Sequence, residues 1–169
     1  MFDQMVLGVD PGVASVGLAA VTRGTSRPAV AWAATVRTPP DLDTGARLRR
    51  IYAAVRSAIA ERDAGVVALE RLLWGRNTGS AMTVARASGV IMLAAADAGI
   101  GVQEYAPLEV KMAVTGVGNA SKAQVRRALG LVLGKAGVPS QPDAADAVAV
   151  ALCHLQQSRL RALTAGPLR

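Results

Sequence analysis

The sequence contains little of several residue types on which whole classes of protein depend. Its one cysteine, Cys153, excludes a disulfide framework and a cysteine-rich zinc site and fits a reducing, cytoplasmic setting. Aromatic residues make up only 3% of the chain, which argues against a sheet-borne platform for stacking single-stranded bases. The longest strictly apolar runs, 90–96 and 147–153, are too short to span a membrane, and the first residues lack the basic flank of a signal peptide.

Positive charge, in contrast, is in excess. The 169 residues include 19 Lys and Arg against 12 Asp and Glu, a formal net charge of +7. The excess is spread over both 1–100 and 101–169. A basic globular protein most often binds a polyanion, nucleic acid first, although solubility alone is the other explanation. With 51% hydrophobic residues the chain can bury a sizeable core.

Hydrophobic periodicity and turn residues predict one α/β domain with a mixed sheet over 1–158, followed by a flexible basic tail over 159–169. The predicted strands are 5–10, 15–21, 28–36, 66–70 and 102–105, of which the first three form an antiparallel meander. The first three predicted helices begin after Asp41 or Asp43, at Thr78 or Ser80, and at Pro107. A fourth helix begins with a capping box of Ser121 and Gln124, and this helix ends near 137–139. A fifth helix begins with a second capping box over 140–143 and ends near Gln157.

Four acidic residues stand at positions where a carboxylate needs an explanation. Asp10 and Glu70 each end an apolar run that reads as a buried strand, and neighbouring strand ends form the crevice in which α/β proteins bind ligands. Asp143 and Asp146 are three residues apart in the first turn of a helix, so they share one face and repel each other unless a cation lies between them. Carboxylates alone would select a hard divalent cation such as Mg²⁺ or Mn²⁺.

Each acid also has a purely structural explanation. Glu70 can pair with Arg71 or Arg76, and Asp10 can cap the turn that follows it. The helix dipole stabilises an acid in a first turn, which explains one member of the pair at 143 and 146 but not both.

Six blocks of sequence carry a family resemblance. They are LGVDPG at 7–12, ALE at 68–70, PLEVK at 107–111, AVTG at 113–116, ASKAQV at 120–125 and DAADA at 143–147. In this order, from about Met5 to about His154, the chain resembles the RuvC family of Holliday-junction resolvases. The first block alone is weak, because actin-like ATPases and other RNase H-like nucleases begin similarly, but the later blocks at this spacing are specific.

The resemblance implies an RNase H-like fold, a mixed five-stranded sheet flanked by helices. It implies a homodimer that binds four-way DNA junctions and nicks two strands symmetrically, leaving ligatable ends, with two Mg²⁺ or Mn²⁺ ions in each active site. It places Asp10, Glu70, Asp143 and Asp146 on the metal-binding catalytic acids, and Lys111 and Lys122 on basic positions used in DNA binding and catalysis. The family works beside a junction-binding tetramer and a hexameric motor ATPase.

One loop departs from the family pattern. Some members carry an aromatic residue three positions after the catalytic glutamate, where this chain has Leu73 followed by Trp74. Either Trp74 stacks on a junction base, Leu73 acts as an apolar wedge, or Trp74 packs on the core. Arg76 and Asn77 of this loop, and Arg126 one helical turn after Lys122, are further expected DNA contacts.

Three rival functions and three minor expectations complete the hypotheses. An actin-like ATPase would need two such domains, another RNase H-like nuclease would act on RNA, and a non-catalytic DNA-binding module would have no use for four clustered acids. The helix over 80–97 is either a dimer contact or ordinary core. His154 is too far along its helix to join the acids and is expected to be structural, and Cys153 to be core.

Overall fold

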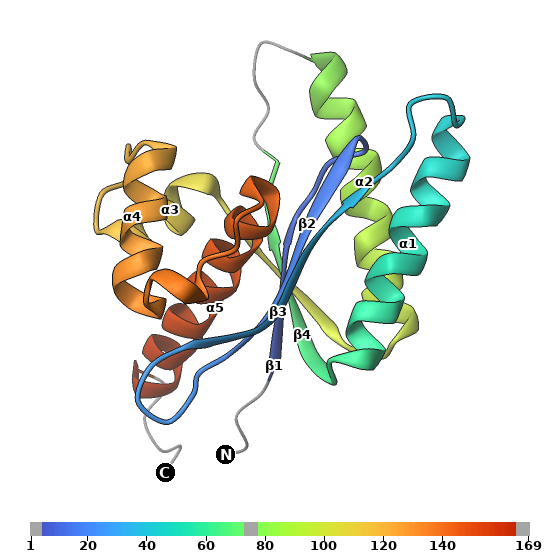
Figure 1. Ribbon diagram of the computed structural model, residues 1–169. Helices are drawn as coiled ribbons and strands as arrows, with labels where there is room; N and C mark the ends of the chain where they lie inside the picture. The colour runs from blue at the N-terminus through green and yellow to red at the C-terminus, as the bar shows by residue number, and fades with distance from the viewer. Residues whose placement is uncertain (1–4, 73–77, 165–169) are drawn as a thin grey trace.

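The computed structural model describes residues 5–72 and 78–164, with the backbone alone at 78–80 and 162–164 (Figure 1). The strands are β1 (Met5–Asp10), β2 (Ser15–Thr22), β3 (Ala29–Arg37), β4 (Ala64–Glu70) and β5 (Gly101–Tyr105). The helices are α1 (Thr44–Glu61), α2 (Thr78–Asp97), α3 (Pro107–Thr115), α4 (Lys122–Leu133) and α5 (Pro142–Thr164), with a 3₁₀ turn, η1 (Lys135–Gly137), between the last two. No helix in these described ranges is long and apolar enough to cross a membrane.

The five strands form one mixed sheet in the order β3-β2-β1-β4-β5. β1, β2 and β3 are antiparallel neighbours, as the short turns between them predict, whereas β4 and β5 run parallel to β1. The parallel pairing of β1 with β4 brings their carboxyl ends to the same edge of the sheet. The mixed five-stranded sheet flanked by helices is therefore confirmed.

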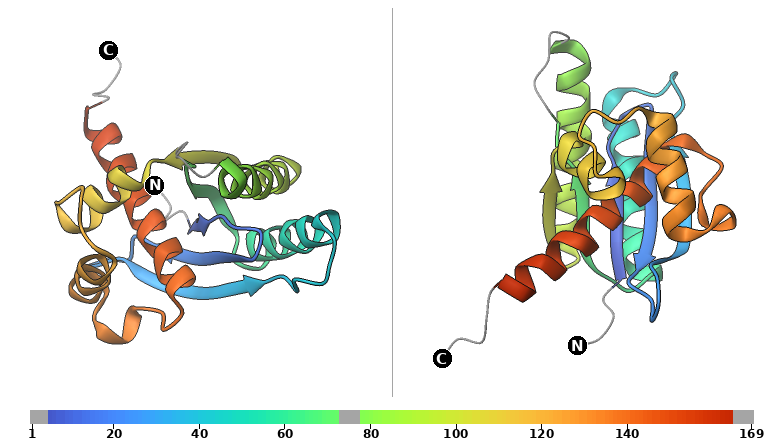
Figure 2. Two further views of the ribbon diagram at one scale, coloured as in Figure 1. Left: turned by 90° about the horizontal axis from the view of Figure 1, so that it is seen from above. Right: turned by 90° about the vertical axis from the view of Figure 1, so that its left-hand side faces the viewer.

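Helices cover both faces of the sheet. α1 and α2 lie on one face, and α3, α4 and α5 lie on the other (Figures 1 and 2). Side chains along β1 alternate between the two cores: Leu7 and Val9 pack toward α1 and α2, and Val6 packs toward α5. By the same alternation Gly8 and Asp10 face α5.

Two strand glycines let α5 lie directly on the sheet. A Cβ atom at Gly8 would collide with the main-chain carbonyl of Ala147, and one at Gly17 would collide with the carbonyl of Asp143. Gly17 is the register partner of Asp10 across the β1–β2 ladder. The missing side chains therefore set the first turn of α5 beside the end of β1, where Asp10 stands.

Local capping explains where two of the helices begin. The Asp43 carboxylate accepts a hydrogen bond from the Ala46 N–H at 2.9 Å and so begins α1. Ser121 and Gln124 form the predicted capping box, in which the Gln124 side chain accepts from the Ser121 N–H at 2.8 Å. This box fixes the turn of α4 that carries Lys122.

Three predicted boundaries are wrong. α5 begins one residue later than a Ser140 cap would require, because its first helical bond runs from Ala145 N–H to the Gln141 carbonyl at 3.0 Å. α4 ends at Leu133, before the expected stop at 137–139, since Gly134 adopts a φ of 80°. α5 runs to Thr164 instead of Gln157, and a hydrogen bond from the Arg161 guanidinium to the Gln103 side chain at 3.2 Å helps to hold its extension.

Candidate active site

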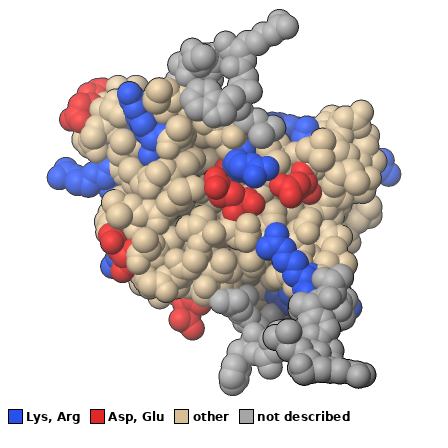
Figure 3. Space-filling view, turned by 180° about the vertical axis from the view of Figure 1, so that it is seen from behind, with Lys and Arg blue, Asp and Glu red and all other residues tan. Residues whose placement is uncertain are grey.

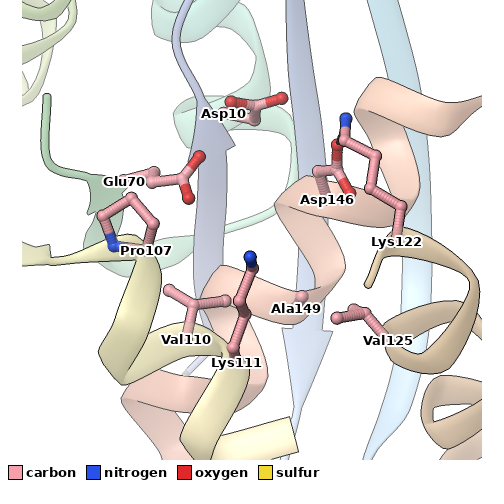
Figure 4. Close-up of a pocket in the computed structure, with 9 residues that line it drawn as sticks. All are labelled: Asp10, Glu70, Pro107, Val110, Lys111, Lys122, Val125, Asp146 and Ala149. Carbon is pink, nitrogen blue, oxygen red and sulfur yellow. Dashed lines mark hydrogen bonds and ion pairs between the residues drawn. The ribbon is translucent and has the colours of Figure 1, made fainter. Parts of the chain in front are cut away.

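A pocket of about 160 Å³ opens where the carboxyl ends of β1 and β4 meet α3, α4 and α5. Three carboxylates and two ammonium groups point into one space in this pocket (Figure 4). The lining residues are Asp10, Glu70, Pro107, Val110, Lys111, Lys122, Val125, Asp146 and Ala149. Five of the six residues expected to be catalytic are thus brought together from five different elements.

Asp10 and Glu70 are the two acids at the strand ends, and both are half-buried. Burial, the nearby charges of Glu70, Asp146 and Asp143, and a hydrogen bond to Glu70 raise the pKa of Asp10 to about 8. Burial also raises the pKa of Glu70. Without a cation, the pair keeps a proton on Asp10, which donates to the Glu70 carboxylate, because two desolvated carboxylates so close together cannot both ionise.

Asp146 lies on α5, one turn after the helix begins, and it has a cationic partner. The Lys122 Nζ lies 3.0 Å from Asp146 Oδ2 and donates a hydrogen bond to it. This hydrogen bond and the charge of Asp146 raise the pKa of Lys122. The Lys122 side chain is 85% exposed, so the ion pair is free to exchange with solvent or with another ligand.

Asp143 does not line the pocket, although it belongs to the same neighbourhood. Its side chain is half-buried, and its charge contributes to the raised pKa of Asp10. The fourth acid therefore acts on Asp10 through space from the first turn of α5.

Lys111 enters the pocket from α3, whereas Lys122 enters it from α4 beside Asp146 (Figure 4). The charges of Lys122 and Lys111 both oppose the effect of burial on the pKa of Glu70. The acids are thus flanked by two cations on different helices. Acidic and basic side chains also gather close together near the middle of the face shown in Figure 3.

The donor chemistry of this pocket fits a divalent metal ion. The acidic groups of the pocket are all carboxylates, and burial and the neighbouring carboxylates, which raise the pKa of Asp10, disfavour a charge that such an ion would stabilise. Among residues 5–72 and 78–164, however, no three Asp, Glu, His or Cys side chains already meet at metal-binding spacing. Holding an ion would require small side-chain movements, above all release of Asp146 from Lys122.

Other predicted DNA contacts lie away from this pocket or outside the described residues. Arg126 is exposed on α4, where it lines a separate shallow groove with Arg127, Leu131 and Lys135. The shared helical face expected for Arg126 and Lys122 therefore does not place both at the acids. The four expected contacts Leu73, Trp74, Arg76 and Asn77 lie outside the described residues.

The structure also tests the structural roles that the sequence suggested for Arg71, His154 and Cys153. Arg71, a proposed partner of Glu70, instead places its guanidinium 3.8 Å from the Glu109 carboxylate. The His154 Nδ1 lies 2.9 Å from the Tyr105 hydroxyl, and burial lowers the pKa of this histidine. Cys153 is fully buried, and burial raises the pKa of its thiol to about 12. His154 and Cys153 therefore have the structural roles expected of them.

Two kinds of site residue escaped sequence reasoning. The apolar wall, formed by Val110, Val125 and Ala149, carries no chemical signature in the sequence. Gly8 and Gly17 were also missed, although a glycine in an otherwise apolar strand signals a close approach of backbone, and both sit beside Asp10.

Comparison with known proteins shows the family of this chain. The family model described as "Crossover junction endodeoxyribonuclease RuvC" matches residues 6–154. The chain belongs to the RuvC family. Curated members from Syntrophomonas wolfei and Corynebacterium jeikeium are each 42% identical to it, over 92% and 96% of this chain and 90% and 100% of their own. Family membership implies dependence on a divalent metal ion.

Solved structures of Holliday-junction resolvases share the fold. The Thermus thermophilus RuvC bound to a Holliday junction superposes with a TM-score of 0.87 and 32% identity, covering 93% of this chain and 96% of that one. A yeast mitochondrial Holliday junction resolvase, 12% identical, matches with a TM-score of 0.69 over 95% of this chain and 81% of its own, a likeness of fold alone. The RNase H-like fold expected from the sequence is confirmed.

Proposed function

We propose that this chain is a Holliday-junction resolving endonuclease that nicks two strands of a four-way DNA junction symmetrically, in homologous recombination and DNA repair. The observation that carries the proposal is the pocket that gathers Asp10, Glu70, Asp146, Lys111 and Lys122 in a chain matching the RuvC family over 6–154. Hydrolysis of a phosphodiester bond by such a site would leave ligatable ends.

The acids are proposed to hold two Mg²⁺ or Mn²⁺ ions. Asp10 and Glu70 would be ligands from the sheet, and Asp143 and Asp146 from α5. Two ions in such a site position the attacking water and stabilise the leaving oxygen of an in-line displacement. Release of the shared proton of Asp10 and Glu70 would then restore the full negative charge of the pair.

The two lysines are proposed to act on the phosphate. Lys111 and Lys122 reach the pocket from two different helices and would neutralise charge that develops on the scissile phosphate. Lys122 has a second role in this proposal, because leaving Asp146 frees its ammonium group for DNA at the moment that the carboxylate takes up an ion.

Contacts beyond the pocket are proposed from position and charge. The exposed Arg126 would bind phosphate of a junction arm, and Leu73, Trp74, Arg76 and Asn77 follow Glu70 closely enough in sequence to reach the same DNA. The branch-migration partners, a junction-binding tetramer and a hexameric motor ATPase, and the cytoplasmic location are part of the same proposal.

The chain is further proposed to act as a homodimer through α2. Met82, Gly89 and Leu93 recur on the exposed side of this helix at seven- and four-residue spacing, whereas Ala87, Ile91 and Ala94 face the core. A two-fold dimer would present two active sites to two like-oriented strands of a junction.

A cleavage assay tests the function directly. The wild type and Asp146→Asn are incubated with a four-way junction, a linear duplex of the same sequence and an RNA–DNA hybrid, each with Mg²⁺, Mn²⁺ or a chelator. We expect paired, ligatable nicks in the junction alone, dependent on metal, and at least about a hundredfold loss in the variant with junction binding retained. Preferred cleavage of the hybrid would instead favour an RNA-directed nuclease, and full activity of Asp146→Asn would contradict the proposed metal site.

A further inference from the structure

Glu109 is an acid near the pocket that has no role in the proposed reaction. It does not line the pocket, yet it stands between two residues that do, Pro107 and Lys111, in the first turn of α3. Its carboxylate makes two contacts that link different walls of the site.

The first contact fixes the start of α3. Glu109 Oε2 accepts a hydrogen bond from the Ala106 N–H at 2.7 Å. Ala106 is the N-cap residue, and an alanine has no side-chain acceptor with which to satisfy the first helical N–H groups. The bond from Glu109 therefore does for α3 what the Gln124 side chain does for α4, and no side chain does what Ser121 does there.

The second contact reaches the end of β4. The Arg71 guanidinium lies 3.8 Å from Glu109 Oε2, and Arg71 is the residue that directly follows Glu70. The Arg71 N–H also donates to the Tyr105 carbonyl at 2.8 Å, which holds the chain beyond Glu70 against the end of β5. Ala106 directly follows Tyr105. Glu109 therefore contacts both Arg71, at the end of β4, and the residue that follows the end of β5.

We infer that Glu109 is a positioning residue, which fixes Lys111 on α3 relative to Glu70 on β4 by bonding to both segments. The expected effect on the cleavage rate rests on the proposed nuclease function, whereas the expected effect on the order of α3 does not. The Arg71 and Glu109 side chains are 51% and 43% exposed, so their ion pair adds little to stability and the bond to Ala106 carries most of the restraint.

Three variants separate positioning from general loss of stability. Glu109→Ala removes both contacts, whereas Glu109→Gln keeps an acceptor for the Ala106 N–H. Asp43→Ala is the matched control, because Asp43 also caps a helix with its carboxylate, but that helix is α1 on the opposite face of the sheet. Cleavage is measured in a single turnover at saturating protein and metal, beside junction affinity and thermal unfolding.

We expect Glu109→Ala to cleave about tenfold more slowly, since a misplaced group costs rate even when binding is intact. Junction affinity should stay within about twofold, because Glu109 itself is placed outside the reacting groups. Glu109→Gln should recover most of the rate, and Asp43→Ala should lower the unfolding temperature similarly with no change in rate. Equal rate losses in Glu109→Ala and Asp43→Ala would overturn the inference.

A double variant tests whether the effect passes through the lysine. In a Lys111→Met background, Glu109→Ala should cause little further loss of rate, because the group that it positions is already absent. Losses that multiply fully would show that Glu109 acts elsewhere.

Hydrogen exchange on the metal-free protein keeps this test separate from the proposed function. Glu109→Ala should speed exchange of the amides at 110–114 in α3 about fivefold while those at 125–129 in α4 stay unchanged. If the wild type cleaves no junction but α3 loosens in this way, the nuclease proposal fails and the positioning role stands. Unchanged exchange in α3 would overturn the positioning role itself.

Discussion

At the scale of single residues, the pocket is dominated by a shortage of positive charge around Asp10. Its carboxyl group is half-buried, and two further carboxylates from Glu70 and Asp146 face it. Lys111 and Lys122 offset part of this charge, but neither removes the proton that Asp10 and Glu70 share. A divalent cation would therefore stabilise the site, and in the metal-free protein the proximity of the acids destabilises the folded state.

This destabilisation predicts how the stability of the metal-free protein depends on pH. The pKa of Asp10 is about 8 in the folded chain and about 3.8 when unperturbed. Below pH 4 the carboxyl is protonated in both states, and between pH 4 and 8 only the folded state keeps the proton. Its contribution to stability is thus fully present in acid and is lost as the pH rises through about 8.

Asp10→Asn should remove this dependence. In the presence of a chelator at pH 8, we expect the variant to unfold at a temperature higher by about 2–4 °C for each kcal/mol of relieved repulsion, and we expect the difference to shrink at pH 5. Thermal unfolding followed by circular dichroism at the two pH values measures it, with the exposed Asp41→Asn as control. A wild type that is equally stable relative to Asp10→Asn at both pH values would contradict the raised pKa.

At the scale of elements, the decisive feature is how closely α5 lies on β1 and β2. Gly8 and Gly17 leave room for the main chain of α5 at Ala147 and Asp143. This contact brings acids that are far apart in the sequence to one edge of the sheet. The position of the site is thus determined as much by two missing side chains as by the acids.

Gly17→Ala tests this packing with a methyl group. We expect a loss of about 1–3 kcal/mol in stability and a larger loss of cleavage, since the methyl group collides with the Asp143 carbonyl and displaces the first turn of α5. Gly130→Ala is the matched control: Gly130 lies within α4 with no atom near its Cβ position, so the substitution should stabilise by about 0.5–1 kcal/mol. Chemical denaturation measures both, and a tolerated Gly17→Ala would argue against close contact.

Features that depend on local sequence could be predicted, whereas features that depend on tertiary contacts could not. Strand and helix positions follow from local periodicity, and the caps at Asp43 and Ser121 were readable because they depend on residues a turn apart. The end of α5 was not readable, because its last turns are held by a contact with Gln103 that local sequence does not reveal. In the site, the acids were evident from their place at element ends, whereas the pairing of Arg71 with Glu109 depends on tertiary distance.

The outer side of α2 carries a prediction about assembly. Leu93 is 54% exposed and Met82 is 49% exposed, an unfavourable state for two large apolar side chains in an isolated chain. If α2 is the dimer contact, Leu93→Glu should convert a dimer to a monomer. Light scattering after gel filtration measures the mass, with Leu131→Glu on α4, 81% exposed, as the control that should leave the dimer intact. A wild type that is monomeric would remove α2 from the proposal.

At the scale of the whole molecule, basic residues lie on the helices of both faces of the sheet. Between 110 and 142, which includes most of α3 and all of α4, the sequence has five basic residues and no acidic one. Lys111 and Lys122 reach the pocket, and Arg126, Arg127 and Lys135 continue outward along one groove. α1, on the opposite face, is also rich in arginine, so net charge alone does not say which face binds DNA.

The dependence of junction binding on salt distinguishes the two faces. If DNA docks along α4, each lost phosphate contact should reduce the slope of log K against log [salt] by about 0.9, so that Arg126→Ala with Arg127→Ala reduces it by nearly 2. The matched pair Arg49→Ala with Arg50→Ala, exposed on α1, removes the same charge and should leave the slope unchanged. Both pairs are measured by fluorescence anisotropy in an Asp146→Asn background, which prevents cleavage during titration. Equal reductions in the two slopes would mean that the net charge of +7 acts as a general field, and a reduction confined to the α1 pair would place the DNA on the other face of the sheet.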